Sequence, residues 1–128
     1  MPSDKPIIAI VENDQSLLKA LARLISAFGY QIEIYASAEE FLHRSEITKL
    51  ACLVLDINLD GISGLALQKH LRNEEVSTSA DTTLPVIFIS GRDDVATIGE
   101  AVDYGCVAYL HKPVDSSTLR RLLSNLLA

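Results

Sequence analysis

Three polar side chains that could act together lie far apart in the sequence: Asp56, Ser90 and Lys112. Each closely follows a short, mainly apolar run, at residues 52–55, 86–89 and 107–110. Runs of this length predict buried strands, so each polar residue would stand at or just beyond a strand's carboxyl end. Ligands of open parallel sheets bind beyond those ends. A carboxylate, a hydroxyl and an ammonium are therefore candidates for one shared site.

A fourth apolar run, residues 7–11, leads directly to Glu12 and Asn13. Glu12 and Asp56 together would form an acidic pocket suited to Mg²⁺, which prefers carboxylates, carbonyls and phosphate oxygens; Mn²⁺ could replace it. Lys112 would add a fixed positive charge and Ser90 a hydroxyl donor. This combination suits phosphoryl transfer onto a carboxylate, with Asp56 as the nucleophile of an aspartyl phosphate. The metal and Lys112 would neutralise charge on the phosphoryl oxygens.

The elements that must position these residues alternate along the chain. Helical spacing of apolar residues follows Asp14, the capping box Ser37–Glu40, and the glycine-containing loop that ends near Gly64. Two more helices are expected, one ending at Gly105 and one capped by Asp115 or Ser116. Strands alternating with helices predict a parallel sheet covered on both faces, which is a doubly wound α/β fold.

The order of strands follows from their patterns. Residues 31–35 alternate polar and apolar side chains, which is typical of an edge strand with one wetter face. The five-stranded order 2-1-3-4-5 places this strand at an edge and opens a crevice between strands 1 and 3. Residues 74–84 are polar and rich in Ser and Thr, so we expect a long loop there.

Composition limits the classes of function. The 128 residues, 48% of them hydrophobic, fit one domain over residues 1–128. The net charge of −6 disfavours binding of nucleic acid by this domain alone. No apolar run approaches the roughly 20 residues of a membrane span, and the polar start resembles no secretory signal, so we expect no membrane association and a cytoplasmic location. Cys52 and Cys106 are expected to be reduced, buried thiols without a metal role.

The sequence resembles the receiver domain of bacterial two-component response regulators, above all receivers of FixJ-type transcriptional regulators. The resemblance covers essentially the whole chain and is carried by residues 10–14 (IVEND), 35–42 (YASAEEFL) and 110–113 (LHKP), together with Asp56 and Ser90-Gly91. It implies a flavodoxin-like receiver fold. It also implies that the domain signals by being phosphorylated and is not an enzyme in the ordinary sense. Its chemistry would be limited to its own phosphorylation and dephosphorylation.

The resemblance also implies roles for the residues around the phosphoacceptor. Asp56 would accept the phosphoryl group and bind the metal. Glu12 and Asn13 match the family's acidic pair, and Asn58 would offer its backbone carbonyl to the metal. A sensor histidine kinase would be the phosphodonor.

Further roles follow for residues after strands 4 and 5. Ser90, with Gly91 beside it, would contact the phosphoryl group, as would Lys112, which matches the family's invariant lysine. The bond before Pro113 would be cis. Ser90 and Tyr109 would form a switch that changes the surface of helix 4, strand 5 and helix 5, to control transcription or favour a homodimer. Tyr109 could instead be an ordinary half-buried aromatic residue of an edge strand.

Two positions depart from the family's pattern. Asn13 stands where the family usually has a second acid, so the pocket would hold two carboxylates instead of three and bind Mg²⁺ more weakly. Asp60 stands where the family often has Pro. Asn13 supports an alternative reading, in which the domain is a degenerate receiver that binds partners without being phosphorylated.

Other readings fit the residues less well. A flavin-binding protein of the same topology needs a phosphate-binding loop rich in Ser, Thr and Gly after strand 1, where residues 12–14 are Glu, Asn and Asp. A hydrolase using Ser90 lacks a neighbouring histidine, and His43 and His70 are expected to face solvent. Residues 56–61 match the first half of a calcium-binding loop, but its closing position is Leu67.

Overall fold

The structure, a computed structural model, describes residues 5–43, 50–78, 84–91, 95–103 and 105–127. Strands and helices alternate throughout this part of the chain, as the sequence predicts. Their bounds are β1 (Ile7–Val11), α1 (Gln15–Ala27), β2 (Gln31–Tyr35), α2 (Ala38–Leu42), β3 (Cys52–Asp56), α3 (Gly64–Thr78), β4 (Val86–Ser90), α4 (Val95–Asp103), β5 (Ala108–His111) and α5 (Ser116–Leu126).

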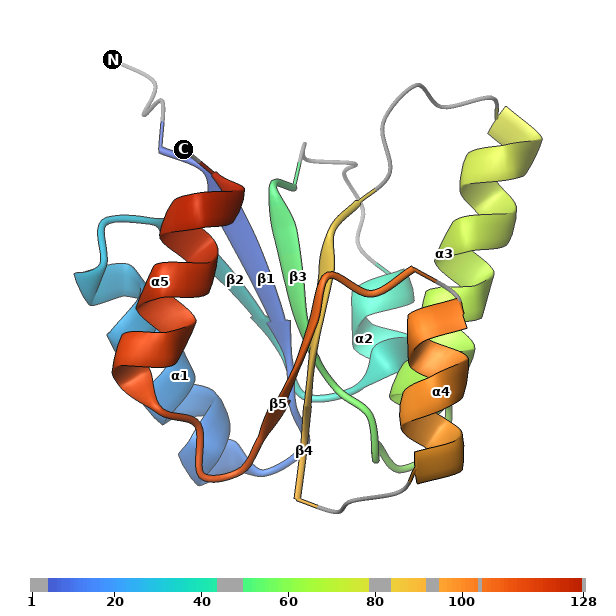
Figure 1. The fold of residues 1–128 in the computed structure, drawn as a ribbon, viewed down its shortest axis with the longest axis horizontal. Helices are drawn as coiled ribbons and strands as arrows, with labels where there is room; N and C mark the ends of the chain where they lie inside the picture. The colour runs from blue at the N-terminus through green and yellow to red at the C-terminus, as the bar shows by residue number, and fades with distance from the viewer. Residues whose placement is uncertain (1–4, 44–49, 79–83, 92–94, 104, 128) are drawn as a thin grey trace.

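The strands form one parallel sheet in the order β2-β1-β3-β4-β5, which confirms the predicted order (Figure 1). In the register of the sheet, Val11 pairs with Leu55, Asp56 with Ile89, and Ser90 with His111. All strands therefore end along the same edge. The residues that follow them, including Glu12 and Lys112, emerge there.

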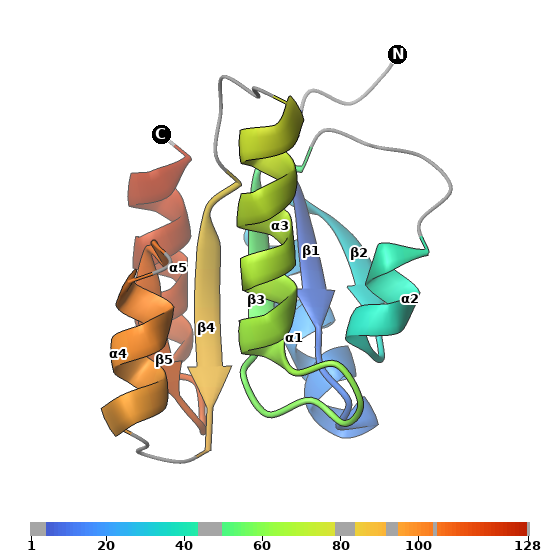
Figure 2. The same cartoon turned by 90° about the vertical axis from the view of Figure 1, so that its right-hand side faces the viewer.

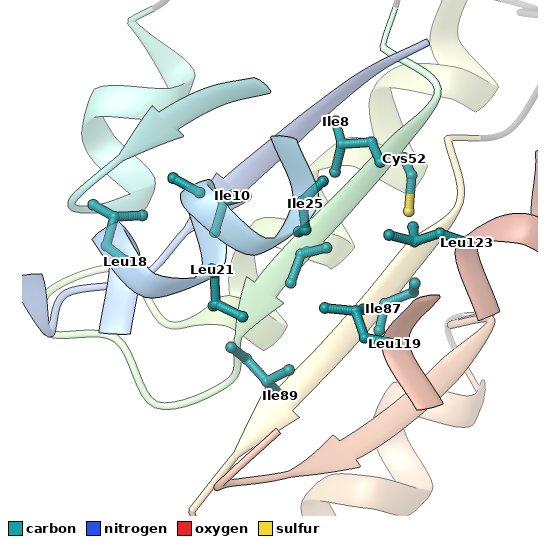
Figure 3. Packing of buried hydrophobic residues seen from close by; sticks show 12 residues of the cluster. Ile8, Ile10, Leu18, Leu21, Ile25, Cys52, Ile87, Ile89, Leu119 and Leu123 are labelled. Carbon is teal, nitrogen blue, oxygen red and sulfur yellow. The ribbon is translucent and has the colours of Figure 1, made fainter. Parts of the chain in front are cut away.

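Helices cover both faces of the sheet. Helices α1 and α5 pack on one face, while α2, α3 and α4 pack on the other (Figures 1 and 2). Figure 3 shows the first of these two layers, in which side chains of the inner strands meet apolar residues of the two helices. Its members include Ile8, Ile10, Leu18, Leu21, Ile25, Cys52, Ile87, Ile89, Leu119 and Leu123. Strands β3 and β4 are buried at every residue, because helices cover them on both sides.

The edge strand β2 and the helix caps also agree with the sequence. Strand β2 is only partly buried. Asp14 caps α1 by accepting hydrogen bonds from the N–H groups of Ser16 and Leu17, and Gly29 follows the helix with a φ of 102°. The Ser37 hydroxyl caps α2 through the N–H of Glu40 at 3.1 Å. Asp115, one of the two candidates, caps α5 through the N–H of Thr118 at 2.9 Å.

One prediction about the segment after α3 is wrong. Residues 74–78 were expected to belong to a long loop, but they continue α3 to Thr78. A helix that is already formed gains one hydrogen bond for each residue added, and two successive glutamates are good helix formers, so the Ser and Thr that follow do not stop it at once. Residues 79–83 of the expected loop lie outside the described residues.

The cysteines and histidines take the places expected, with one qualification. Both thiols are free, and burial raises the pKa of Cys52 to about 12. Cys106 is only partly buried. His43 and His70 are exposed.

In the part of the chain that the structure describes, none of the helices has both the length and the apolar character needed to cross a membrane.

Candidate functional site

Asp56 is the last residue of β3 and only 2% exposed, and both of its carboxylate oxygens have partners. Oδ1 accepts a hydrogen bond from the backbone N–H of Asn58 at 3.0 Å, and Oδ2 accepts one from Lys112 Nζ at 3.2 Å. The four residues of β3 before Asp56 are all apolar, so this carboxylate is the only polar side chain that the strand carries to this edge of the sheet. The two contacts then fix its orientation there.

Glu12, the residue after β1, lies on the other side of the same ammonium group. Its side chain is 0% exposed, and Oε1 lies 2.8 Å from Lys112 Nζ. Oε2 accepts a hydrogen bond from the backbone N–H of Asp14 at 3.1 Å, which links Glu12 to the cap of α1. Lys112 itself is held by its backbone N–H, which donates to the carbonyl of Ser90 at 2.8 Å. The lysine thus bridges two buried carboxylates that come from different strands.

The surroundings of this cluster raise the pKa of both the acid, Glu12, and the base, Lys112. Burial, joined by the neighbouring carboxylate of Asp56, raises the pKa of Glu12 above its usual value, although Lys112 opposes that shift. Burial alone would lower the pKa of Lys112, but the two carboxylates outweigh it and raise the pKa. Lys112 therefore keeps its positive charge at neutral pH and is available to stabilise an anion in addition to these two carboxylates.

Ser90 and Gly91 lie beside these residues. Ser90 ends β4 and is buried, and its hydroxyl accepts a hydrogen bond from Asn58 Nδ2 at 3.1 Å. Because the backbone of Asn58 also binds Asp56, one residue connects the hydroxyl to the carboxylate. A side chain added at Gly91 would meet Lys112 Cδ at 3.9 Å, so the Lys112 side chain passes close to this glycine.

Asn13 and Asp60, the two departures from the family's pattern, are in contact. Asn13 Nδ2 donates a hydrogen bond to Asp60 Oδ2 at 3.2 Å, although the residues are 47 positions apart. Both side chains are exposed. The contact joins the turn between β1 and α1 to the loop between β3 and α3.

The donors present fit a hard divalent cation. Two carboxylates, Glu12 and Asp56, and the amide of Asn13 are the oxygen-bearing groups that Mg²⁺ uses. Glu12 Oε1 is buried and makes no hydrogen bond of normal geometry, although it forms the ion pair with Lys112. Over the described ranges, no three or more His, Cys, Asp and Glu side chains are grouped so that they could hold a metal ion.

The remaining candidates lie on and after β5. Tyr109 is half-buried and packs against the core layer under α2, α3 and α4. Its ring meets that of His111 edge-on, with 5.3 Å between centroids. The bond between Lys112 and Pro113 is cis, as the resemblance implies. Tyr109 therefore occupies a position compatible with either of its two predicted roles.

Two contacts that hold the loop between β3 and α3 were not predicted. Glu39 Oε2, from α2, accepts a hydrogen bond from the backbone N–H of Ile62 at 3.3 Å. The backbone of Gly64 lies against Asp56, where a Cβ would overlap the carbonyl of Asp56 and come within 2.8 Å of Ile57 Cα. The glycine was a visible signal of close approach. Nothing in the local sequence indicates the contact of Glu39.

Comparison with known proteins shows which family this chain is similar to. The family model described as response regulator receiver domain matches residues 8–124. Nodulation protein W of Bradyrhizobium diazoefficiens is 34% identical over 111 residues, covering 87% of this chain and 46% of that protein. Response regulator protein TodT of Pseudomonas putida is 32% identical over 107 residues, covering 84% of this chain and 44% of that protein.

A FixJ protein and a solved structure extend these similarities. Transcriptional regulatory protein FixJ of Azorhizobium caulinodans is 29% identical over 119 residues, covering 93% of this chain and 53% of that protein. The chain thus spans about half the length of the curated relatives it matches. A two-component response regulator from Clostridium difficile has the same fold, with a TM-score of 0.85, 24% identity and coverage of 96% of each chain.

Proposed function

The chain belongs to the response regulator receiver domain family, and on this basis we propose that Asp56 accepts a phosphoryl group from a sensor histidine kinase. Receiver domains are signalling domains and not classical enzymes. The observation that supports the proposal most directly is the 3.2 Å contact between Lys112 Nζ and Asp56 Oδ2, because it places a permanent positive charge beside the expected nucleophile.

Each residue of the site has a part in this reaction. The N–H of Asn58 and the ammonium of Lys112 orient the Asp56 carboxylate, so little reorganisation precedes attack. Lys112 then stabilises the negative charge of the phosphoryl oxygens. Glu12, Asp56, Asn13 and the backbone carbonyl of Asn58 would hold Mg²⁺. The ion would supply further neutralisation of phosphoryl charge when bound.

Phosphorylation would change the site by charge and hydrogen bonding. A phosphoryl group adds a charge of roughly −1.5 to −2 and three strong acceptors. The Ser90 hydroxyl would leave its bond with Asn58 and donate to these new oxygens. Tyr109 would respond to this movement, changing the surface formed by α4, β5 and α5. That surface would then favour a homodimer or contact an output domain.

The whole protein's activity forms part of the same proposal. The relatives are about twice as long as the matched region, and one of them is a transcriptional regulatory protein. We propose that this receiver likewise controls an output such as transcription, in the cytoplasm, through a partner or segment that it regulates. The net charge of −6 makes direct binding of nucleic acid by this domain unfavourable.

A second candidate function is favoured by one observation. Asn13 replaces an acid that the family usually has, which lowers the negative charge available to a cation. A degenerate receiver would keep the fold and bind its partner without phosphate. The two candidates differ in whether Asp56 can be phosphorylated at saturating Mg²⁺.

Intact-protein mass spectrometry after incubation with acetyl phosphate and Mg²⁺ tests the proposal. The expected result is the addition of one phosphoryl group to the parent chain and its loss in Asp56→Asn. Asp103→Asn, a change of the same type at the far end of α4, should leave phosphorylation intact. A parent chain that gains no phosphate at saturating Mg²⁺ would contradict the proposal and support the degenerate receiver.

A further inference from the structure

We propose that Asp60 is a positioning residue of the cation site, which it serves by orienting the amide of Asn13 and by adding nearby negative charge. The inference rests on the proposed function, because it concerns the same Mg²⁺ site. It gives a role to the hydrogen bond between Asn13 Nδ2 and Asp60 Oδ2 at 3.2 Å. Asp60 would thereby offset part of the charge that Asn13 lacks.

The loop that carries Asp60 is held on both sides of that residue. Leu59 is buried beneath it, and the backbone N–H of Ile62 donates to Glu39 at 3.3 Å. The loop closes when the N–H of Gly64 donates to the carbonyl of Ile57 at 3.2 Å. Figure 2 shows this green loop beside the turn that follows β1. The Asp60 backbone is therefore fixed close to Asn13 by contacts that do not involve its own side chain.

The chemistry of an amide makes this contact directional. Asn13 has a donor nitrogen and an acceptor oxygen on the same carbon, whereas an ionised carboxylate only accepts hydrogen bonds. Reversing the amide would bring its oxygen against the oxygens of Asp60. Asp60 therefore selects the orientation in which Nδ2 is engaged and Oδ1 is left for another partner. In the proposed site, that partner is the cation.

Asp60 acts through Asn13 and not as a third carboxylate ligand. Among the residues that the structure describes, no three acidic, histidine or cysteine side chains are grouped around one ion position. The buried Glu12 Oε1 makes no hydrogen bond of normal geometry and is paired with Lys112 Nζ at 2.8 Å, so a cation in the proposed site would share this carboxylate with the lysine. The charge of Asp60 still favours a nearby cation, but solvent screens this attraction because the side chain is exposed.

Calorimetric titration of the protein with MgCl₂ alone separates the two effects. Asp60→Ala removes both the acceptor and the charge, and we expect affinity to fall about tenfold, the lower end of effects seen for residues that orient metal ligands. Asp60→Asn keeps an acceptor oxygen and removes only the charge, so it should lose less. Asp103→Asn removes the same charge far from the site and should bind Mg²⁺ as the parent does. Thermal unfolding of each variant confirms that it is folded.

A double-mutant cycle tests the orientation directly. In an Asn13→Ala background there is no amide to orient, so Asp60→Ala should cost only the charge effect, matching Asp60→Asn in the parent. An equal loss from Asp60→Ala in both backgrounds would show a pure charge effect and overturn the positioning role. Parent-like binding by Asp60→Ala would overturn the inference and leave the proposed function standing. If the parent chain itself binds no Mg²⁺, the proposed site and this inference both fail.

Discussion

Lys112 Nζ and Glu12 Oε1 lie 2.8 Å apart although two strands, β3 and β4, separate the strands that precede them. The lysine side chain therefore crosses the edge of the sheet and passes Asp56, which it contacts at 3.2 Å. This single ammonium group is the ion-pair partner of two buried carboxylates. The charge expected to stabilise a phosphoryl group is thus also a charge on which the fold depends.

Replacing Lys112 by Met should reduce stability at neutral pH. It would leave Glu12 and Asp56 buried without their cation, and we expect a loss of about 2 kcal/mol, less than for a fully buried pair because the Lys112 side chain is 27% exposed. The pKa of Glu12 is already raised by burial, so the folded state binds this proton more strongly than the unfolded state. The stability gained from protonated Glu12 is complete below the pKa that Glu12 has in the unfolded state. It is lost as the pH rises through the higher pKa of the folded state. Urea unfolding followed by circular dichroism should show a smaller defect at pH 5 than at pH 7.

Lys69→Met provides the matched control for that substitution. Lys69 pairs with Glu100 at 3.4 Å, with the two side chains 39% and 52% exposed. Exposed pairs contribute little, so we expect a change below about 0.5 kcal/mol that varies little with pH. Equal losses from both lysine substitutions would contradict the view that burial makes the Lys112 cluster distinct.

The affinity for Mg²⁺ should decrease as the pH falls, beginning above the pH at which an ordinary glutamate takes up its proton. Burial raises the pKa of Glu12, and a proton on Glu12 competes with a cation for the same oxygens. Calorimetry with MgCl₂ between pH 7.5 and about pH 5 measures this dependence. Glu12→Gln, which cannot ionise, should bind more weakly at pH 7.5 and lose most of the dependence. An unchanged pH profile in Glu12→Gln would exclude Glu12 as its source.

The arrangement of the sheet and most of the site could be predicted from the sequence because local signals specify them. The inner strands are continuous apolar runs and β2 alternates, which is enough to order the sheet. Once the order is known, the polar residues at the strand ends must share one edge. The caps at Asp14 and Asp115 could also be predicted, because a capping side chain accepts hydrogen bonds from residues close to it in the sequence.

The parts that could not be predicted depend on how distant loops pack. Asn13 and Asp60 were each recognised as unusual, but no local pattern shows that they touch. The contact of Glu39 with Ile62 depends on where α2 lies against the loop. The length of α3 was underestimated because Ser and Thr near its end suggested a loop, while the helix already formed extended through them.

Gly64→Ala should disturb Asp56 without changing any polar residue. A Cβ at this position would overlap the carbonyl of Asp56, and backbone cannot move aside as a flexible side chain can. We expect a loss of about 1–3 kcal/mol, as for other overpacked positions, with slower phosphorylation by acetyl phosphate. Gly99→Ala is the matched control, because it lies in α4 with nothing within 4 Å of the added atom. It should stabilise the protein by up to about 1 kcal/mol. Parent-like stability and phosphorylation in Gly64→Ala would contradict the close approach.

Ser90→Ala should leave phosphorylation of Asp56 intact but abolish the structural change that phosphorylation causes at β5. The hydroxyl accepts a hydrogen bond from Asn58 at 3.1 Å, and Asn58 is exposed, so water can replace this partner. Stability should therefore change by no more than about 1 kcal/mol, and Asp56 should still gain a phosphoryl group in the mass spectrum. What should be lost is the response of Tyr109 and of the surface around β5, because no hydroxyl remains to donate to the new oxygens.

Amide resonances in two-dimensional NMR spectra measure that response, with Ser26→Ala on the exposed side of α1 as the control. If phosphorylated Ser90→Ala shows the same shifts in β5 as the phosphorylated parent, the signal leaves the site by a route that does not involve Ser90.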